Sequence, residues 1–150
     1  MTAEGESTAD DPLDLGRFVA AQADVYQRAL SEIRRGEKQT HWMWFVFPQL
    51  AGLGTSEMAR RYAIRSVAEA EAYLGHAILG PRLVECAHAL LAVEGRTARQ
   101  ILGSPDDLKL QSCATLFARV AHGEMVFAQL LERFFAGRSD LKTVELLQKL

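Results

Sequence analysis

Apolar residues recur at helical spacing along almost the whole chain. Over residues 15–33 they fall three and four positions apart, the pattern of a helix with one buried face. Asp14 is placed to cap this helix, and Gly36 suits the left-handed position after its end. Residues 1–13 are mostly acidic and polar and lack any such period. We therefore expect a disordered tail, followed by a single helical domain over residues 14–150.

Capping residues mark the remaining helices. A Ser, Thr or Asp before an apolar run accepts hydrogen bonds from the first helical N–H groups, and Pro is tolerated in a first turn. Such start signals occur at Thr55 or Ser56, Ser66, Pro81, Thr97, Ser104-Pro105 (with Ser104 as the cap) and Asp140. No convincing pair of strands appears. The pattern predicts an all-α fold, a compact single-domain bundle of about seven helices.

One segment, residues 42–47, interrupts this regular pattern after the first helix. Its sequence WMWFVF has neither a clean two-residue nor a clean 3.6-residue period, and most of its side chains are large enough to require burial. Pro48 disfavours a helical conformation at Phe47. We expect an irregular aromatic segment, either a short helical turn or an irregular strand, that is buried on most sides.

Composition excludes several classes of protein. The 150 residues carry a net charge of −2, which provides no basic field for a phosphate backbone, so we expect no nucleic-acid partner. No apolar run approaches the ~20 residues that span a bilayer, so we expect no membrane partner. Cys86 and Cys113 lie among apolar neighbours without metal-ligand spacing. We expect buried free thiols, a cytoplasmic location, and neither a metal nor a cofactor.

The aromatic segment also carries the first candidate chemistry. His41 beside Lys38 has the composition of a general base in a partly desolvated site, and a structural histidine bonded to a backbone carbonyl is the alternative. Trp42 and Trp44 offer faces on which a planar ligand could stack, although burial in the core is the commoner fate of such residues. Gln49 is placed to orient such a ligand by hydrogen bonds.

A second group of candidates surrounds the small-residue loop. Gly52, Gly54 and Ser56 precede a helix, an arrangement that can hold phosphate, with a plain turn and N-cap as the alternative. Lys109 and Ser112 lie one turn apart on a predicted helix, where lysine could assist a serine, or both could be ordinary surface groups. With Arg82 and Lys38, Lys109 would supply positive charge to an anionic ligand.

The segments together resemble a bacterial family known as domain of unknown function 1810, whose members are sometimes labelled calpastatin. The resemblance rests on residues 36–56 (GxKxxHWMWFVFPQLxGLGxS), 69–74, 79–83 and 105–117. It implies a mainly helical fold in a small stand-alone bacterial protein and supplies no established activity. The chain departs from the usual family pattern at Ala77, Cys113 and Ala114.

Three functional hypotheses follow. The leading one is a site for a small polar or nucleotide-like ligand at the KxxHWMWFxFPQLxGLGxS segment and the Lys109 helix. The second is a non-enzymatic module that grips a partner protein with exposed aromatic side chains. The third is a hydrolase or transferase acting on an ADP-ribose-type compound, with His41 as the catalytic base. The sequence leaves the oligomeric state and the existence of catalysis open.

Overall fold

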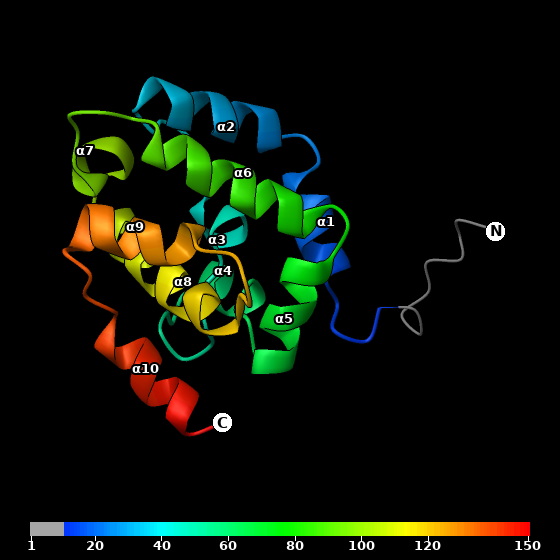
Figure 1. Cartoon of the computed structure of the whole chain (residues 1–150). Coiled ribbons are helices and arrows are strands. Elements are labelled where there is room, and N and C mark those ends of the chain that lie inside the picture. The colour runs from blue at the N-terminus through cyan, green and yellow to red at the C-terminus, as the bar shows by residue number, and fades with distance from the viewer. Residues whose placement is uncertain (1–10) are drawn as a thin grey trace.

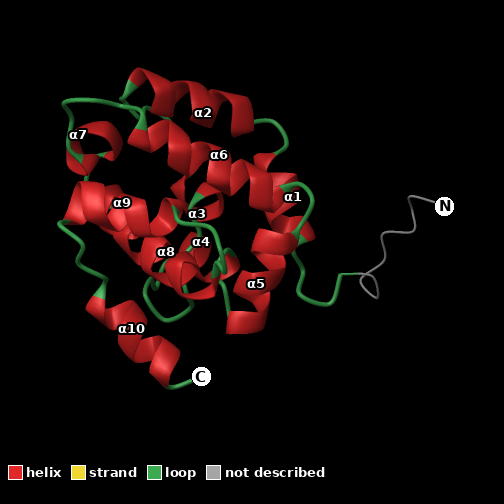
Figure 2. Cartoon of the chain, in the orientation of Figure 1, coloured by secondary structure: helices red, strands yellow, loops and turns green. Residues whose placement is uncertain are grey.

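The computed structural model describes residues 11–150, which form ten helices and no strand (Figures 1 and 2). The expected tail falls almost wholly on residues 1–10, which lie outside the described part. The all-α class is confirmed, and the expected number of helices was too low. The helices are α1 (Gly16–Gln22), α2 (Tyr26–Arg35), α3 (Met43–Val46), α4 (Glu57–Arg61), α5 (Val67–Gly75), α6 (Leu79–Leu91), α7 (Ala98–Leu102), α8 (Asp106–Val120), α9 (Val126–Phe135) and α10 (Leu141–Gln148).

The first predicted helix is in fact two helices. A turn after Gln22 separates α1 from α2, and each half packs on a different neighbour, α1 on α3 and α2 on α6. Asp14 is not the cap either, because it has a positive φ of 54°. The Asp11 carboxylate instead accepts hydrogen bonds at 2.8 Å from the backbone N–H groups of Leu15 and Gly16. Asp11 is thus part of the folded domain.

Helix α8 is the centre of the molecule. It packs most extensively on α9 and also touches α5, α7 and α10, while α2 and α6 run side by side across the top of Figure 1. The middle stretch of α8, residues 112–117, is buried without interruption. Because polar residues in such a helix need partners, the Ser112 and Thr115 hydroxyls donate to the carbonyls of Leu108 and Gln111.

Most of the predicted caps are confirmed. The side chains of Ser56, Ser66 and Asp140 accept hydrogen bonds from the third residue of their helices, and Thr97 forms a full capping box. The prediction for Ser104 was wrong, because α8 has no side-chain cap hydrogen bond. The N–H groups of its first turn donate instead to the backbone carbonyls of residues 103 and 105.

The aromatic segment forms a single helical turn, α3, as one of the two predicted alternatives had it. Trp42 and Phe47 flank this turn, and each side chain is only 1% exposed. Their rings pack at 6.3 Å between centroids. The segment is therefore largely core, and only Trp44 within it is partly exposed among residues 42–47.

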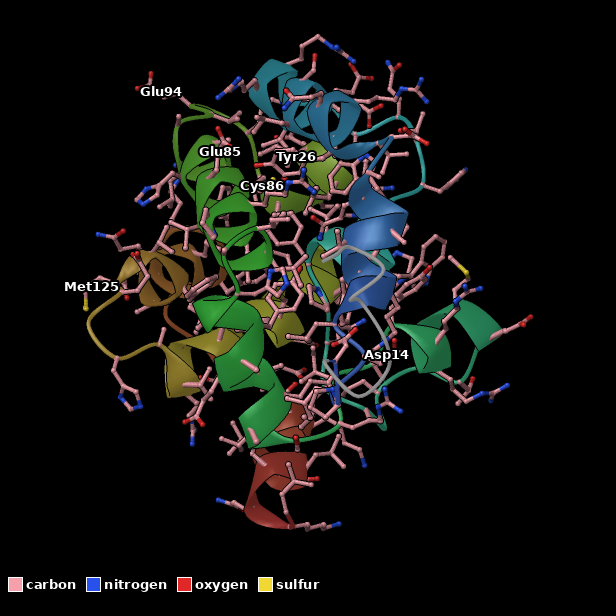
Figure 3. The ribbon with its side chains drawn as sticks, turned by 90° about the vertical axis from the view of Figure 1, so that its right-hand side faces the viewer. Asp14, Tyr26, Glu85, Cys86, Glu94 and Met125 are labelled. Atoms are coloured by element: carbon pink, nitrogen blue, oxygen red, sulfur yellow. The ribbon has the colours of Figure 1, made fainter. Side chains whose placement is uncertain are left out.

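Both cysteines are free and buried, as expected. Burial raises the pKa of the Cys86 thiol to about 12 and that of Cys113 well above its ordinary value. Cys86 lies on α6 next to Glu85, whose carboxylate accepts a hydrogen bond from the Tyr26 hydroxyl of α2 (Figure 3). Within residues 11–150, every helix is too short or too polar to cross a bilayer.

Candidate functional site

The loop between α3 and α4 is fixed by backbone pairing. Ala51 donates to the Ile64 carbonyl and Ile64 donates to the Gln49 carbonyl, both at 2.8 Å, so the chain before and after α4 forms a short parallel bridge. Gly54 lies in this loop against α4, and a Cβ atom at this position would come within 2.5 Å of the Ala59 Cβ. The glycine is needed because the loop approaches α4 so closely.

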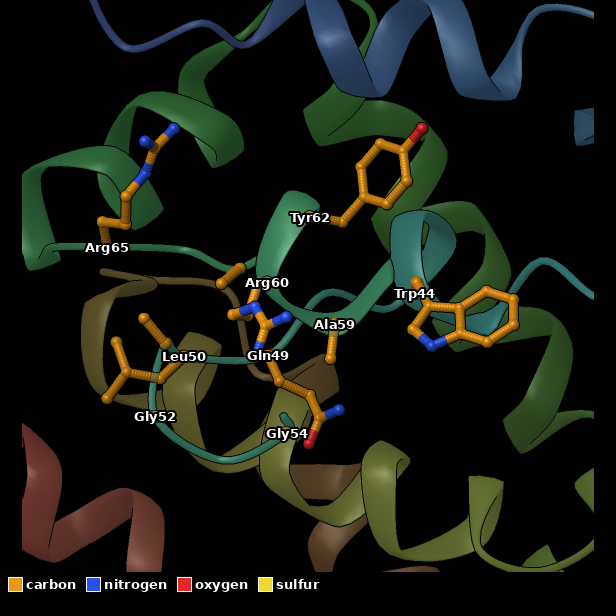
Figure 4. Close-up of a pocket in the computed structure, with 11 residues that line it drawn as sticks. Trp44, Gln49, Leu50, Gly52, Gly54, Ala59, Arg60, Tyr62 and Arg65 are labelled. Carbon is orange, nitrogen blue, oxygen red and sulfur yellow. The ribbon is translucent and has the colours of Figure 1, made fainter. Parts of the chain in front are cut away.

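Two adjoining cavities open beside this loop. The first, of about 310 Å³, is shown in Figure 4, with Trp44 at one end, Arg65 at the other and Gln49 between them. The second, of about 380 Å³, lies toward the start of α8. They share four lining residues, which are Trp44, Gln49, Gly54 and Ala59. Cavities of this size accommodate small molecules.

Trp44 and Lys109 meet at the second cavity. The Lys109 ammonium lies 5.0 Å from the centroid of the Trp44 ring, an attractive cation–π geometry. Both side chains line the cavity, so one apolar face and one positive charge are presented together. The other charged lining residue of this cavity is Asp140, whose carboxylate is occupied as the cap of α10.

A chain of charges leads from this lysine into the protein. Asp106 pairs with Lys109 at 3.4 Å and with Lys38 at 2.9 Å. The Lys38 side chain is only 8% exposed and lies 5.1 Å from the Trp42 ring centroid. Its backbone N–H donates to the Ile101 carbonyl, which ties this part of the chain to α7. Lys38 therefore reaches the site only through its ion pair with Asp106 and does not line either cavity.

A buried carboxylate organises the segment that carries Lys38. Glu32 is 2% exposed and accepts hydrogen bonds from the N–H groups of Gln39 and Thr40, the Thr40 hydroxyl and the Trp42 indole. Burial alone would raise the pKa of Glu32, but these four donors outweigh it and lower the pKa to about 2. The indole N–H of Trp42 is satisfied in the core by this contact.

The structure brings together seven of the residues that the sequence singled out. They all line one or both cavities and come from α3, the loop between α3 and α4, and α8: Trp44, Gln49, Gly52, Gly54, Ser56, Lys109 and Ser112. Ser112 is not an activated nucleophile in this arrangement, since its hydroxyl donates to the Leu108 carbonyl within its own helix.

Four other predicted residues lie elsewhere. Trp42 is buried in the core, and Lys38 is held behind the site by Asp106. His41 is exposed and lines neither cavity. Arg82 lies on α6, where its guanidinium stacks on the Tyr26 ring at 4.7 Å and donates to the Gln22 side chain at 3.3 Å. Arg82 thus joins α6 to α1 and α2.

Arg60 and Arg65 were not singled out by the sequence, yet both line the first cavity. Arg60 donates to the Thr55 carbonyl, and Arg65 lies 3.7 Å from the Glu69 carboxylate. Arg60 lies in α4 and Arg65 in the chain that follows it, and their presence is a weak sequence signal because arginine is mostly exposed on protein surfaces. Within residues 11–150, no three His, Cys, Asp or Glu side chains are grouped so as to hold a metal.

Comparison with known proteins agrees with the fold. The chain is similar to the crystal structure of the conserved hypothetical protein Rv1873 from Mycobacterium tuberculosis, with 53% identity and a TM-score of 0.90. The match covers 91% of this chain and 98% of that one. A search among curated proteins found no match. The model of a family described as a protein of unknown function (DUF1810) matches residues 12–147. The chain therefore belongs to the DUF1810 family.

Proposed function

We propose that this protein binds a small ligand that combines a planar ring with an anionic group, such as a nucleotide. The proposal rests on one observation above all: Trp44 and Lys109 are in cation–π contact on the wall of the same cavity. The exposed part of the Trp44 ring stacks on the ligand ring, and Lys109 binds the anionic group. Gln49 lines both cavities and orients the ligand by hydrogen bonds.

The charge around the two cavities favours an anion. Arg60, Arg65 and Lys109 line them, against the single carboxylate of Asp140, which is already used as a helix cap. Since the cationic side chains that line the two cavities attract the opposite charge, a phosphate or carboxylate is favoured over a neutral or cationic group. The arginines bind anions in addition to Lys109 when a ligand extends into the first cavity.

The positions of Trp42, Phe45 and His41 do not support the two alternative functions, a protein-binding module and an enzyme with His41 as its base. A module that grips a partner with exposed aromatics needs an exposed Trp42 or Phe45, whose side chains are 1% and 7% exposed. An enzyme with His41 as its base needs the imidazole within reach of a bound substrate. His41 lines neither cavity, so we propose binding without assigning a reaction.

Thermal-shift measurements with AMP, ADP, ribose 5-phosphate, NAD and adenosine test the proposal. A ligand at ~100 times its dissociation constant adds about 2.7 kcal/mol to the stability of the folded protein, which is easily seen. We expect Lys109→Met to abolish the shift caused by AMP while the long apolar stem still covers Trp44.

His41→Ala is the matched control, because this exposed side chain lies outside both cavities. It should respond to AMP like the wild type. The proposal is overturned if no compound of this set shifts the midpoint, or if Lys109→Met responds as the wild type does.

A further inference from the structure

Two lysine side chains, Lys38 and Lys109, share the single carboxylate of Asp106. Lys38 lies 2.9 Å from one oxygen of Asp106, and Lys109 lies 3.4 Å from the other. The closer partner of Asp106 is thus the buried lysine, not the lysine on the cavity wall. Taken together, the two ammonium groups and the carboxylate carry one net positive charge.

We infer that Lys38 is a positioning residue that makes the ligand-binding site cationic: by neutralising Asp106, it leaves the charge of Lys109 available to an anionic ligand. This inference rests on the proposed function. Lys38 is 8% exposed and lines neither cavity, so it acts through Asp106 and touches no ligand.

The geometry explains why a second lysine is needed. Asp106 is in the first turn of α8, and Lys109 follows it on the same face three residues later. Without Lys38, this carboxylate would pair with Lys109 alone and cancel its charge. A ligand phosphate would then have to compete with Asp106 for the same ammonium group, in a half-buried place where charges are poorly screened.

The position of Lys38 is enforced by the fold. Its backbone N–H is bound to the Ile101 carbonyl at 2.7 Å, and its ammonium rests on the Trp42 ring. The Trp42 indole is bound in turn to Glu32 at 2.9 Å. The order of contacts is therefore Glu32, Trp42, Lys38, Asp106, Lys109 and Trp44, which leads from a buried acid to the half-buried ring at the cavity.

AMP and adenosine provide a matched pair of probes, because they differ only by the phosphate. Lys38→Met should weaken AMP binding at least about fivefold, since the site loses one unit of net charge close to the phosphate. Adenosine binding should stay unchanged. Binding is measured by titration calorimetry in low salt, and circular dichroism verifies the fold of each variant.

The double variant Lys38→Met, Asp106→Asn separates charge from structure. It removes one positive and one negative charge, so it should restore the AMP affinity of the wild type although both charged partners are gone. If Lys38→Met alone folds poorly, this variant can still overturn the inference, because it leaves no uncompensated buried charge and its AMP affinity remains measurable.

Each result has one meaning. If the wild type binds neither AMP nor adenosine, the proposed function fails for nucleotides, and this inference fails with it. If the wild type binds AMP and Lys38→Met binds it equally well, only the role of Lys38 is wrong. A double variant that binds AMP fivefold more weakly than the wild type also overturns the inference, because the pair would then act through something other than its net charge.

Discussion

Glu32 shows how one residue can hold an irregular segment in place. Residues 38–42 lie between helices, and their backbone N–H groups need acceptors that a helix would otherwise provide. The Glu32 carboxylate supplies them to Gln39 and Thr40, and also binds the Trp42 indole. An ionised acid is tolerated in the core because all these donors point at it.

Glu32→Gln should therefore destabilise the protein in a pH-dependent manner. The carboxylate has a pKa of about 2 in the folded state, below the ordinary value of 4.5, so its stabilisation is complete above pH ~4.5. It disappears as the pH falls through about 2. At neutral pH we expect a loss of up to about 3 kcal/mol.

Urea denaturation of both proteins between pH 2 and 7 measures this effect. The difference in unfolding free energy between the wild type and Glu32→Gln should shrink as the pH drops below about 4.5. A difference that is the same at pH 3 and pH 7 would contradict the assignment.

At the scale of elements, the loop between α3 and α4 determines the shape of the cavities. Short-range signals place a cap at Ser56, and the structure confirms it, with the Ser56 hydroxyl accepting from the Ala59 N–H at 3.1 Å. Short-range signals do not predict the close approach of Gly54 to Ala59, because this approach depends on how the loop folds back over the helix. The sequence predicts only a turn or a phosphate-holding loop at Gly54, whereas the structure shows a steric requirement for glycine.

Gly54→Ala should consequently destabilise the protein by about 1–3 kcal/mol, since the new methyl group would lie 2.5 Å from the Ala59 Cβ and the loop would have to move. It should also weaken AMP binding, because both cavities include Gly54.

Gly75→Ala is the control for this change. Gly75 is the last residue of α5, and a Cβ there has nothing within 4 Å. This variant should be neutral or more stable by up to about 1 kcal/mol, because alanine favours the helical state. Guanidinium denaturation compares the two variants, and equal stabilities would refute the steric argument.

The whole molecule is held together by polar contacts between distant helices as well as by its core. Arg17 of α1 donates to the carbonyls of Arg61 and Ala63, at 2.8 and 2.7 Å, and pairs with the buried Glu69 of α5 at 2.7 Å. The Arg17 guanidinium thus links three segments: α1, the chain at and just after the end of α4, and α5. Since the chain after α4 also carries the Ile64 bridge, Arg17 indirectly supports the loop that lines the two cavities.

Arg17→Ala should cost about 3–5 kcal/mol, because it leaves the Glu69 carboxylate buried without its closest partner. The matched control is Arg34→Ala. Arg34 pairs with Glu85 at 3.7 Å, and both side chains are largely exposed, so this loss should stay below about 1 kcal/mol. Thermal unfolding measures both changes, and similar losses for the two variants would argue against the role given to Arg17.

Local rules predicted the parts of this protein that depend on neighbours in sequence. The periodicity and the caps at Ser66, Thr97 and Asp140 placed the helices, since helix ends and apolar faces are set within a few residues. The same rules missed the break after Gln22, where two distant partners, Phe45 and Tyr73, bind its side-chain amide. This break divides one predicted helix into α1 and α2, which is one reason why the number of helices was underestimated.

The candidate site depended much more on the tertiary structure. The sequence alone identified Trp44, Gln49 and Lys109 as side chains suited to bind a ligand. They line the same cavity because α3 and the loop after it pack beside α8. The sequence could not distinguish Trp44 from Trp42, since both have the same local composition. In the fold, Trp42 is buried in the core, where its indole N–H donates to Glu32. Burial and charge pairing arise between distant segments, so the local pattern names the candidates and long-range packing decides which of them line the cavities.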